Sequence, residues 1–432
     1  MPDPAHRQES GMSGRSEIGR ASALAKRDRR RSALPRLGAA LALMVASLLG
    51  ACGGGGTAGA SATPAATPAS AMSATAQLGE KLFADTALSL SGKQACASCH
   101  DAAFAHAAPN SLAAQLGGAD LTLQGTRTAP SIDYLNYDTA FYFAADGTPT
   151  GGFFWDGRAQ SLAEQAGGPF LNAVEMAMPS KAAVVAVVAK ASYAADFRSV
   201  FGSDIFNNAE LAFDRITFAI QAYQREDGDF HRFSSKYDAF LDGKATLTDA
   251  EKRGFALFNN PNKGNCFACH PSARGSDGSP PLFTDFSYDS LGVPRNPELK
   301  ANADASFYDL GLCARPDGSL AHRTDLCGAF KVPSLRNVAL RGALFHNGRF
   351  KSLTEALRFY VTRDTDPAAW YPTVNGEVVK FDDLPAAYRR NVNTSEAPYN
   401  RQPGDAPALN EDEIADVVAF LNTLTDGWTA AK

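Results

Sequence analysis

The 432-residue sequence lacks three features that would each point to a different class of protein. A membrane-spanning helix needs about 20 apolar residues, but the one substantial apolar run covers only the 13 residues from Leu37 to Leu49. A basic surface is also missing: residues 52–432 carry 32 Lys and Arg against 42 Asp and Glu, which argues against a nucleic-acid-binding protein. Alternating β-strand patterns are sparse, so we expect a mainly α-helical fold.

The N-terminus has the order of features that is typical of a secretory signal. A basic block at residues 26–31 precedes the apolar run, and small residues follow it as far as Cys52. The letters L-G-A-C that end at Cys52 resemble a bacterial lipobox, so we expect residues 1–51 to be a lipoprotein signal peptide and Cys52 to carry the lipid. The alternative is an ordinary export signal with an incidental cysteine. Residues 52–77 are rich in Gly, Ala, Ser, Thr and Pro, which predicts a flexible tether.

Four of the seven cysteines lie in two C-x-x-C-H motifs. The motifs are Cys96-Ala97-Ser98-Cys99-His100 and Cys266-Phe267-Ala268-Cys269-His270. Two thiols at this spacing can each bond one vinyl group of a haem, and the adjacent imidazole can then ligate the iron. The alternatives are weaker, because zinc would need four ligands gathered from both motifs and a redox C-x-x-C does not need the histidine. We therefore expect two covalently bound c-type haems.

Cys313 and Cys327 are the remaining pair. In an oxidising compartment we expect them to form a disulfide that closes a loop of about 15 residues, worth roughly 3 kcal/mol. A pair of free thiols is the alternative. A disulfide and two covalent haems both agree with an exported, periplasmic protein.

Three patterns occur twice along the chain. They are G-x-x-L-F before each haem motif, P-S-[IL] after it, and then F-x-[DN]-G-R-x-x-S-L-x-E. The first copies begin at Gly79, Pro130 and Phe154, and the second copies begin at Gly254, Pro333 and Phe345. This repetition predicts two loop-rich, cytochrome c-like haem domains related by an internal repeat, at residues 78–235 and 236–432.

Helical periodicity and one capping motif predict several helices. The periodic segments are Ala182–Lys190, Glu210–Arg225, Leu353–Tyr360 and Glu411–Leu424. The capping box formed by Thr248 and Glu251 predicts the start of the helix that leads to the second haem motif.

A difference between the repeats predicts which of the two haems has an open iron site. Pro169 lies 14 residues beyond Trp155, and Tyr360 lies 14 residues beyond His346. If the repeats superpose, these two side chains face equivalent positions on their haems. A phenolate can coordinate iron and proline cannot, so we predict a second haem capped by Tyr360 and an open first haem that accepts a small oxidant. The alternative is that Tyr360 is only a core aromatic residue.

An open haem that splits peroxide needs a group that moves a proton between the two oxygen atoms. Glu175 stands among apolar residues, where desolvation raises the pKa of a carboxyl group, and is our candidate. Gln165 is a candidate hydrogen-bond donor to the oxidant, and Trp155 is a candidate relay between the haems. The alternatives are that Glu175 is a solvated helix residue, that Gln165 is a helix cap and that Trp155 is a core aromatic residue.

These motifs resemble the bacterial dihaem cytochrome c peroxidase/MauG superfamily, over almost the whole chain from Leu78 to Gly427. The resemblance implies that the N-terminal haem is the peroxidatic one. It also implies that Glu175, Gln165 and Trp155 are the distal glutamate, the distal glutamine and the inter-haem tryptophan.

Within the superfamily, the chain resembles the MauG/MbnH-like enzymes more than the true peroxidases. The peroxidases carry methionine where Tyr360 stands here. They also have a removable histidine ligand in an L-G-H context, whereas this chain reads Gln115-Leu116-Gly117-Gly118, and we predict that the nearby His106 is structural. Further matches to the methanobactin-associated members lie at Leu344–Gly348, Arg363–Pro367, Trp370–Pro372 and Phe381–Pro385.

The chain departs from the family at two positions. MauG has a surface tryptophan two residues before its second motif, and Gly264 replaces it here, so we expect no oxidant to leave by that route. The family's inter-haem calcium uses an asparagine where this chain has Thr128. Thr128 still offers an oxygen, beside the backbone carbonyls near Arg341 and Ala343, so the sequence is compatible with a calcium ion there and with none.

Three functions follow as alternatives. The first is oxidation of an aromatic side chain, a tryptophan, of a partner protein at the expense of hydrogen peroxide. The second is a periplasmic cytochrome c peroxidase that takes electrons from a small cytochrome c or cupredoxin. The third is a non-enzymatic dihaem electron carrier. Tyr360 and the missing histidine favour the first, and Glu175 and Gln165 argue against the third. We expect contact with a membrane only through the lipid of Cys52.

Overall fold

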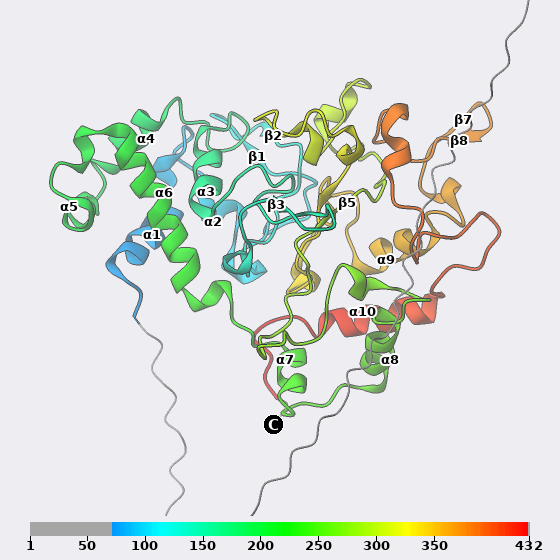
Figure 1. Ribbon diagram of the computed structural model, residues 1–432. Helices are drawn as coiled ribbons and strands as arrows, with labels where there is room; N and C mark the ends of the chain where they lie inside the picture. The colour runs from blue at the N-terminus through cyan, green and yellow to red at the C-terminus, as the bar shows by residue number, and fades with distance from the viewer. Residues whose placement is uncertain (1–70, 431–432) are drawn as a thin grey trace, which may run out of the picture. The chain divides into compact units, whose positions relative to one another are not determined.

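Ten helices and four two-stranded sheets make up residues 71–430, the part of the chain that the computed structural model describes (Figure 1). The helices are α1 (Ala74–Ala84), α2 (Cys96–Cys99), α3 (Leu162–Leu171), α4 (Lys181–Val188), α5 (Ala194–Phe201), α6 (Ala209–Glu226), α7 (Lys236–Leu241), α8 (Asp249–Phe258), α9 (Leu353–Thr362) and α10 (Glu411–Asn422). The strands are β1 (Leu116–Gly117), β2 (Leu123–Gln124), β3 (Tyr142–Phe143), β4 (Pro149–Thr150), β5 (Tyr288–Asp289), β6 (Phe330–Lys331), β7 (Thr373–Val374) and β8 (Glu377–Val378). The mainly α-helical class is therefore confirmed.

Each sheet is a short antiparallel pair, β1 with β2, β3 with β4, β5 with β6 and β7 with β8. All four pairs join strands that follow one another in the chain. Short turns connect three of the pairs, whereas a long segment, from Asp289 to Phe330, separates β5 from β6. Within residues 71–430, no helix is long and apolar enough to cross a bilayer. The predicted signal peptide and Cys52 lie outside the described residues.

The helices expected from periodicity are confirmed to within about two residues, as α4, α6, α9 and α10. The capping box at α8 is confirmed too. The backbone N–H of Glu251 donates to Thr248 Oγ1 at 3.3 Å, and the backbone N–H of Thr248 donates to Glu251 Oε2 at 2.6 Å. Local sequence signals were sufficient here because capping and periodicity act within a few residues.

Helix α1 starts inside the segment 52–77 that was predicted to be a tether. The cause is Ser73, whose Oγ accepts a hydrogen bond from the N–H of Ala76 at 3.1 Å and caps the helix. Ser73 also donates from its backbone N–H and its hydroxyl to the carboxylate of Glu226 on α6, at 2.7 and 2.9 Å. Residues 74–77 are therefore helical and held to α6, which corrects the predicted end of the tether.

Two helix pairs, α1 with α6 and α8 with α10, pack closely in the same way (Figure 1). The glycine of each G-x-x-L-F pattern lies at the contact. A Cβ on Gly79 would lie 2.0 Å from the carbonyl oxygen of Ala219, and a Cβ on Gly254 would lie 1.9 Å from that of Asp416. The two glycines therefore allow a backbone approach that no other residue permits.

The buried apolar side chains form two large clusters. One lies between residues 78 and 230, with Phe170 and Ile216 at its centre, and Cys96 packs against it. The other lies between residues 237 and 424, with Phe359 and Phe420 at its centre, and Cys266 packs against it. Each C-x-x-C-H motif thus borders its own core. The exact domain boundary at residues 235/236 stays a prediction.

Backbone hydrogen bonds run crosswise between the two copies of the repeated patterns. The N–H of Thr128, two residues before the first P-S-[IL], donates to the carbonyl of His346 at 2.7 Å. The N–H of Lys331, two residues before the second, donates to the carbonyl of Trp155 at 2.9 Å. Thr128 therefore binds the segment that precedes α9, and Lys331 binds the segment that precedes α3.

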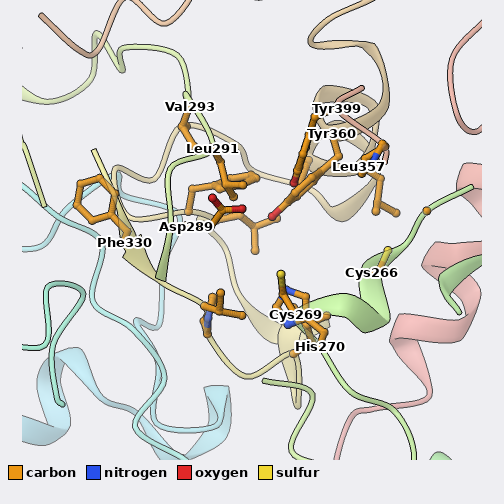
Figure 2. A pocket seen from close by; sticks show the side chains of 18 of the residues that line it. Cys266, Cys269, His270, Asp289, Leu291, Val293, Phe330, Leu357, Tyr360 and Tyr399 are labelled. Carbon is orange, nitrogen blue, oxygen red and sulfur yellow. The ribbon is translucent and has the colours of Figure 1, made fainter. Parts of the chain in front are cut away.

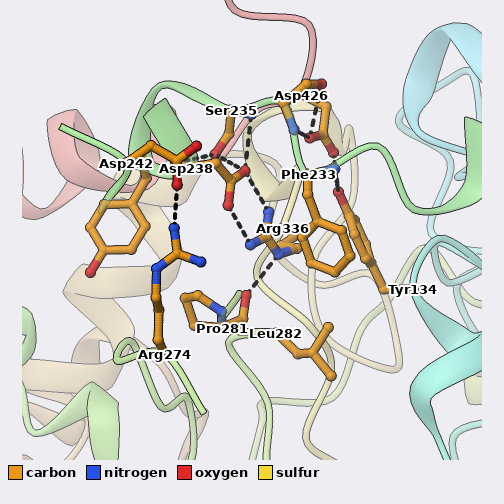
Figure 3. A network of polar contacts seen from close by, with 12 residues as sticks. Tyr134, Phe233, Ser235, Asp238, Asp242, Arg274, Pro281, Leu282, Arg336 and Asp426 are labelled. Carbon is orange, nitrogen blue, oxygen red and sulfur yellow. Dashed lines mark hydrogen bonds and ion pairs between the residues drawn. The ribbon is translucent and has the colours of Figure 1, made fainter. Parts of the chain in front are cut away.

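A network of buried polar groups connects the C-terminal segment with both halves (Figure 3). Arg336 forms a two-pronged ion pair with Asp238, at 2.8 and 2.9 Å. Asp426 accepts hydrogen bonds from Tyr134 Oη at 2.5 Å and from Asn337 Nδ2 at 2.8 Å. Because these groups are buried and paired, loss of one partner would leave an uncompensated charge or polar atom.

Candidate functional site

A deep cavity opens above the second C-x-x-C-H motif (Figure 2). Cys266, Cys269 and His270 line one side. The apolar lining includes Phe258, Leu291, Val293, Leu344, Leu357 and Val417. The apolar lining beside a C-x-x-C-H motif suits a large, flat, mostly apolar group such as a haem.

His270 is oriented for ligation. Its Nδ1 lies 2.7 Å from the carbonyl oxygen of Phe283, so Nδ1–H donates there and Nε2 keeps a free lone pair. Burial lowers the pKa of His270, which favours the neutral imidazole that binds iron. A second hydrogen bond of this kind fixes the ring of a metal-bound histidine.

Tyr360 lies on α9 and directs its hydroxyl into the cavity, on the side opposite His270 (Figure 2). Burial raises the pKa of its phenol well above the ordinary value, so the phenol is neutral unless a cation stabilises the phenolate. An iron ion supplies such a charge. The position and the chemistry of Tyr360 therefore suit an axial ligand.

Two further polar side chains share this part of the cavity. The ring of Tyr399 lies against that of Tyr360, with ring centroids 5.9 Å apart and an angle of 30° between the planes. Asp289 on β5 points to the same space, and burial raises the pKa of its carboxyl group (Figure 2). We did not expect either residue from the sequence, because the loop that carries Tyr399 and the strand that carries Asp289 have no matching motif in the first half.

The first motif lies on α2 and has the same histidine arrangement. Nδ1 of His100 lies 3.0 Å from the carbonyl oxygen of His106, and burial lowers the pKa of His100 to about 4. The residues whose carbonyls accept these hydrogen bonds correspond, since His106 and Phe283 both have a positive φ, 47° and 53°. Cys96 and Cys99 are partly buried and not oxidised to a disulfide, so both thiols fit thioether attachment.

The side chain of His106 makes two buried contacts of its own. Its Nδ1 lies 2.7 Å from Asp133 Oδ1, and its ring stacks on Phe230 with centroids 3.9 Å apart. The ring is thus engaged in the core, while the carbonyl of the same residue holds His100.

Glu175 follows α3 and lies beside the first motif. Its carbonyl oxygen accepts from the N–H of Gly118 at 2.8 Å. Burial raises the pKa of its carboxyl group, although the charge of Arg158 opposes this shift. The Glu175 charge in turn contributes to the raised pKa of Cys96, after burial and the Cys99 thiol. The carboxyl group therefore lies near the thiols of the first haem motif, and its role as the distal glutamate stays a prediction.

Gln165 and Pro169 lie one turn apart on α3. Gln165 is half-buried, and among residues 71–430 its side chain has no hydrogen-bond partner, so its amide is available to a bound molecule. Pro169 is the eighth residue of α3, and Tyr360 is the eighth residue of α9. The two helices therefore present proline and tyrosine at the same point of the repeated motif.

Trp155 belongs to the first repeat but lines the cavity of the second. Its indole Nε1 donates to the carbonyl of Thr128 at 2.8 Å, and only 7% of its surface is exposed. The hydroxyl of Thr128 donates to the carbonyl of Ala113 at 2.7 Å and keeps lone pairs for another contact. Trp155 is thus a buried aromatic residue, fixed by a hydrogen bond, in the lining of the second cavity.

The structure also shows the surroundings of the remaining cysteine pair and of Gly264. Cys313 and Cys327 form a disulfide. Gly264 lies against the second motif, where a Cβ would be 3.0 Å from the carbonyl oxygen of Leu257 and 3.1 Å from Cys266 Sγ, so a large side chain has little room. Within residues 71–430, no cluster of three His, Cys, Asp or Glu residues is arranged to hold a metal ion by itself.

Comparison with known proteins gives a consistent result. The family model of the di-haem cytochrome c peroxidases matches residues 73–246. The chain is 37% identical to methylamine utilization protein MauG of Paracoccus denitrificans, over 82% of this chain and 89% of the relative. It is 30% identical to cytochrome c551 peroxidase of Nitrosomonas europaea, over 81% and 79%. The crystal structure of the diheme peroxidase BthA from Burkholderia thailandensis is similar with a TM-score of 0.76 and 40% identity, over 82% of this chain and 86% of that chain.

Proposed function

The chain belongs to the di-haem cytochrome c peroxidase family that includes MauG, and on this premise we propose that it oxidises a tryptophan of a partner protein with hydrogen peroxide. Family membership makes it a haem peroxidase-type oxidoreductase with two c-type haems. In our proposal peroxide reacts at an open first haem, and the partner is oxidised through a second haem capped by Tyr360. The observation that supports different roles for the two haems is the contrast between Pro169 on α3 and Tyr360 on α9.

Each haem is proposed to be attached by its own motif. The attachment residues are Cys96, Cys99 and His100 for the first haem and Cys266, Cys269 and His270 for the second. The hydrogen bonds from each histidine Nδ1 to a backbone carbonyl support this assignment, because they leave both Nε2 atoms free. When bound, the haems supply the peroxide and one-electron chemistry, and the protein supplies orientation and proton transfer.

We assign the proton transfer to Glu175 and the orientation of peroxide to Gln165. A carboxylate at Glu175 would accept a proton from one oxygen of the peroxide and return it to the other, which would leave as water, while the bound haems would supply the two electrons that the cleavage needs. The raised pKa of this carboxyl group supports the role, since a group that titrates closer to neutral pH both accepts and releases a proton readily. The free amide of Gln165 donates a hydrogen bond that holds the peroxide in line.

Trp155 is proposed as the relay between the haems. It is buried, it is fixed by its hydrogen bond to Thr128, and it lines the second cavity from the first repeat. With such a relay the partner's tryptophan need not reach the first haem. The crosswise hydrogen bonds at Thr128 and Lys331 support an internal repeat in which the two halves face each other across Trp155.

The alternative is a cytochrome c peroxidase that reduces peroxide with electrons from a small cytochrome c or cupredoxin. The 30% identity to cytochrome c551 peroxidase favours it. The two functions differ in their products. The alternative turns over a pool of reduced cytochrome and leaves no modified protein, whereas our proposal predicts a covalently altered tryptophan.

We also propose an exported protein that is anchored in the periplasm through Cys52. The disulfide between Cys313 and Cys327 supports an oxidising compartment. A site with a calcium ion at Thr128 and one without calcium both remain open.

The decisive experiment is the optical spectrum, from the Soret region to the near-infrared, of the diferric protein mixed with one equivalent of peroxide. We expect a rapid change at both haems and a new near-infrared band from charge shared between them. If nothing reacts until one haem has been reduced, the cycle is that of a peroxidase and our proposal fails. Mass spectrometry of candidate exported proteins then searches for the oxidised tryptophan.

A further inference from the structure

Arg341 is a partly buried cation without an anion. Its Nη2 atom is buried and has no hydrogen-bond partner, and no carboxylate of residues 71–430 forms an ion pair with it. Arg336 and Arg127, by contrast, are paired, Arg336 with Asp238 and Arg127 with Asp156 and Asp309. Burial lowers the pKa of Arg341 to about 10, which still leaves it charged at neutral pH.

Arg341 lies where the two haem sites meet. Its guanidinium carbon is 5.9 Å from the centroid of the Trp155 ring. Its side chain lines the cavity of the second motif. Its charge also contributes, after burial, the His106 contacts and a Pro130 contact, to the pKa of His100 in the first motif. One guanidinium is therefore close to the relay residue and to both motifs.

An unpaired buried charge is costly, several kcal/mol in real proteins, unless an anion completes the site. The described part of the chain offers no such anion. A c-type haem does, because its two propionate carboxylates remain free after both vinyl groups have bonded to cysteines. A guanidinium binds a carboxylate through two parallel hydrogen bonds, which suits a planar, fully charged side chain in a dry cavity.

We propose that Arg341 binds a haem propionate and provides a fixed positive charge between the two haems, beside Trp155. The inference rests on the two-haem attachment in the proposed function. In this proposal the guanidinium of Arg341 provides the positive charge that the family resemblance attributes to a calcium ion at this place. A divalent cation held by the carbonyl of Arg341 would be repelled by the guanidinium of the same residue. The fixed charge stabilises the reduced form of the nearer haem and so raises its potential.

The test compares the reduction potentials of both haems in the wild-type holoprotein and in Arg341→Gln. Removal of the charge is expected to shift the ferric–ferrous equilibrium constant of at least one haem tenfold or more toward ferric, which is 59 mV for one electron. Arg341→Lys keeps the charge and should recover most of the shift. Arg253→Gln is the matched control, since it removes a charge from an exposed ion pair with Asp416 on α8 and α10.

A merely structural Arg341 gives a different result. Potentials in Arg341→Gln that equal those of the wild type overturn the proposal, and so does stoichiometric calcium in the wild type whose removal by a chelator changes the potentials. If Arg341→Gln fails to load two haems, Arg341→His replaces it. The charge of this histidine is titrated between pH 5 and 8 in one protein, and the potential should follow that charge; a flat pH profile like that of the wild type rejects the idea.

These measurements are independent of peroxide chemistry. Should the wild type carry two haems but fail to react with peroxide, the proposed function falls and the potentials still decide the role of Arg341. Should two haems react as proposed while the Arg341 variants keep wild-type potentials, only the present inference falls.

Discussion

Helices α3 and α9 occupy corresponding places in the two halves of the molecule and differ in one decisive side chain. Both follow an F-x-[DN]-G-R pattern in which the first residue has a positive φ, 66° at Phe154 and 63° at Phe345. Both are capped by a serine and begin with leucine. At the eighth position α3 has Pro169 and α9 has Tyr360. The same local scaffold therefore carries a side chain without a donor atom at one motif and a phenol at the other.

The polar side chains near the two C-x-x-C-H motifs also differ. Near the first motif lies Glu175, whose carboxyl group has a raised pKa. Near the second lie two tyrosines, Tyr360 and Tyr399, in an enclosed cavity. The two motifs therefore have different polar neighbours, and our proposal attributes different roles to their haems on this ground. Five experiments test this difference.

The largest effect is expected from Glu175→Gln. Loss of the proton carrier should slow the reaction with peroxide by about 10²–10⁴-fold while both haems remain bound. Stopped-flow mixing at several pH values measures it. In the wild type the rate should fall as the pH drops through the raised pKa of Glu175, because only the ionised carboxylate accepts a proton. Glu210→Gln, an exposed residue paired with Lys181, is the control. An unchanged rate in Glu175→Gln would remove this residue from the mechanism.

Pro169→Tyr transfers the α9 side chain to α3. The new phenol should cap the first haem and slow the peroxide reaction at least about tenfold, a barrier increase of roughly 1.4 kcal/mol. Optical and electron paramagnetic resonance spectra would show two low-spin haems in place of one. Pro169→Ala serves as the control, since it changes the helix but adds no ligand. A variant that keeps an open haem would mean that α3 and α9 do not superpose on their haems.

Tyr360→Met makes the second site resemble that of the true peroxidases. A neutral thioether in place of a phenolate should raise the potential of the second haem and abolish the shared near-infrared band. Spectroelectrochemical titration measures the shift. Tyr371→Phe is a matched control, because Tyr371 is also a buried tyrosine but donates its hydroxyl to the carbonyl of Gly292 at 2.5 Å. Equal potentials in Tyr360→Met and the wild type would exclude Tyr360 as a ligand.

Gly79→Ala and Gly254→Ala probe the two close helix contacts. A Cβ at either position would collide with a backbone carbonyl at 2.0 or 1.9 Å, so each substitution should destabilise the protein by about 1–3 kcal/mol. Denaturant unfolding of the holoprotein, followed separately at each haem, reports which half is affected. Gly228→Ala is the control, since its Cβ would meet nothing within 4 Å. Strongly unequal losses would show that the two halves are not built alike.

The smallest effects are expected from the helix caps. The hydroxyls of Ser161 and Ser352 accept from the third helical N–H of α3 and α9, at 3.1 and 3.2 Å. Ser161→Ala and Ser352→Ala should each cost about 1 kcal/mol of stability. The same unfolding measurement applies, with Ser319→Ala on an exposed loop as the control. A much larger loss at one cap would indicate a role for that serine beyond the helix end.

The sequence alone determined the features whose causes are short-range. The C-x-x-C-H motifs are defined by covalent spacing, the helix limits by periodicity and capping, and the pairing of proline with tyrosine by an ungapped repeat. The start of α1 was missed because Ser73 is held by Glu226, which is more than 150 residues away in sequence. The apolar neighbours of Glu175 in the sequence predicted a raised pKa for its carboxyl group, and burial in the folded chain raises it.

Tertiary packing determines where charges and aromatic rings meet. It placed Tyr399 against Tyr360, exchanged backbone hydrogen bonds between the two halves, and left Arg341 beside Trp155 without a carboxylate. No sequence pattern records these facts, because burial and pairing depend on every segment that packs around a group. The physical reason is that desolvation and charge compensation are sums over neighbours from distant parts of the chain, whereas periodicity and motif spacing are properties of adjacent residues.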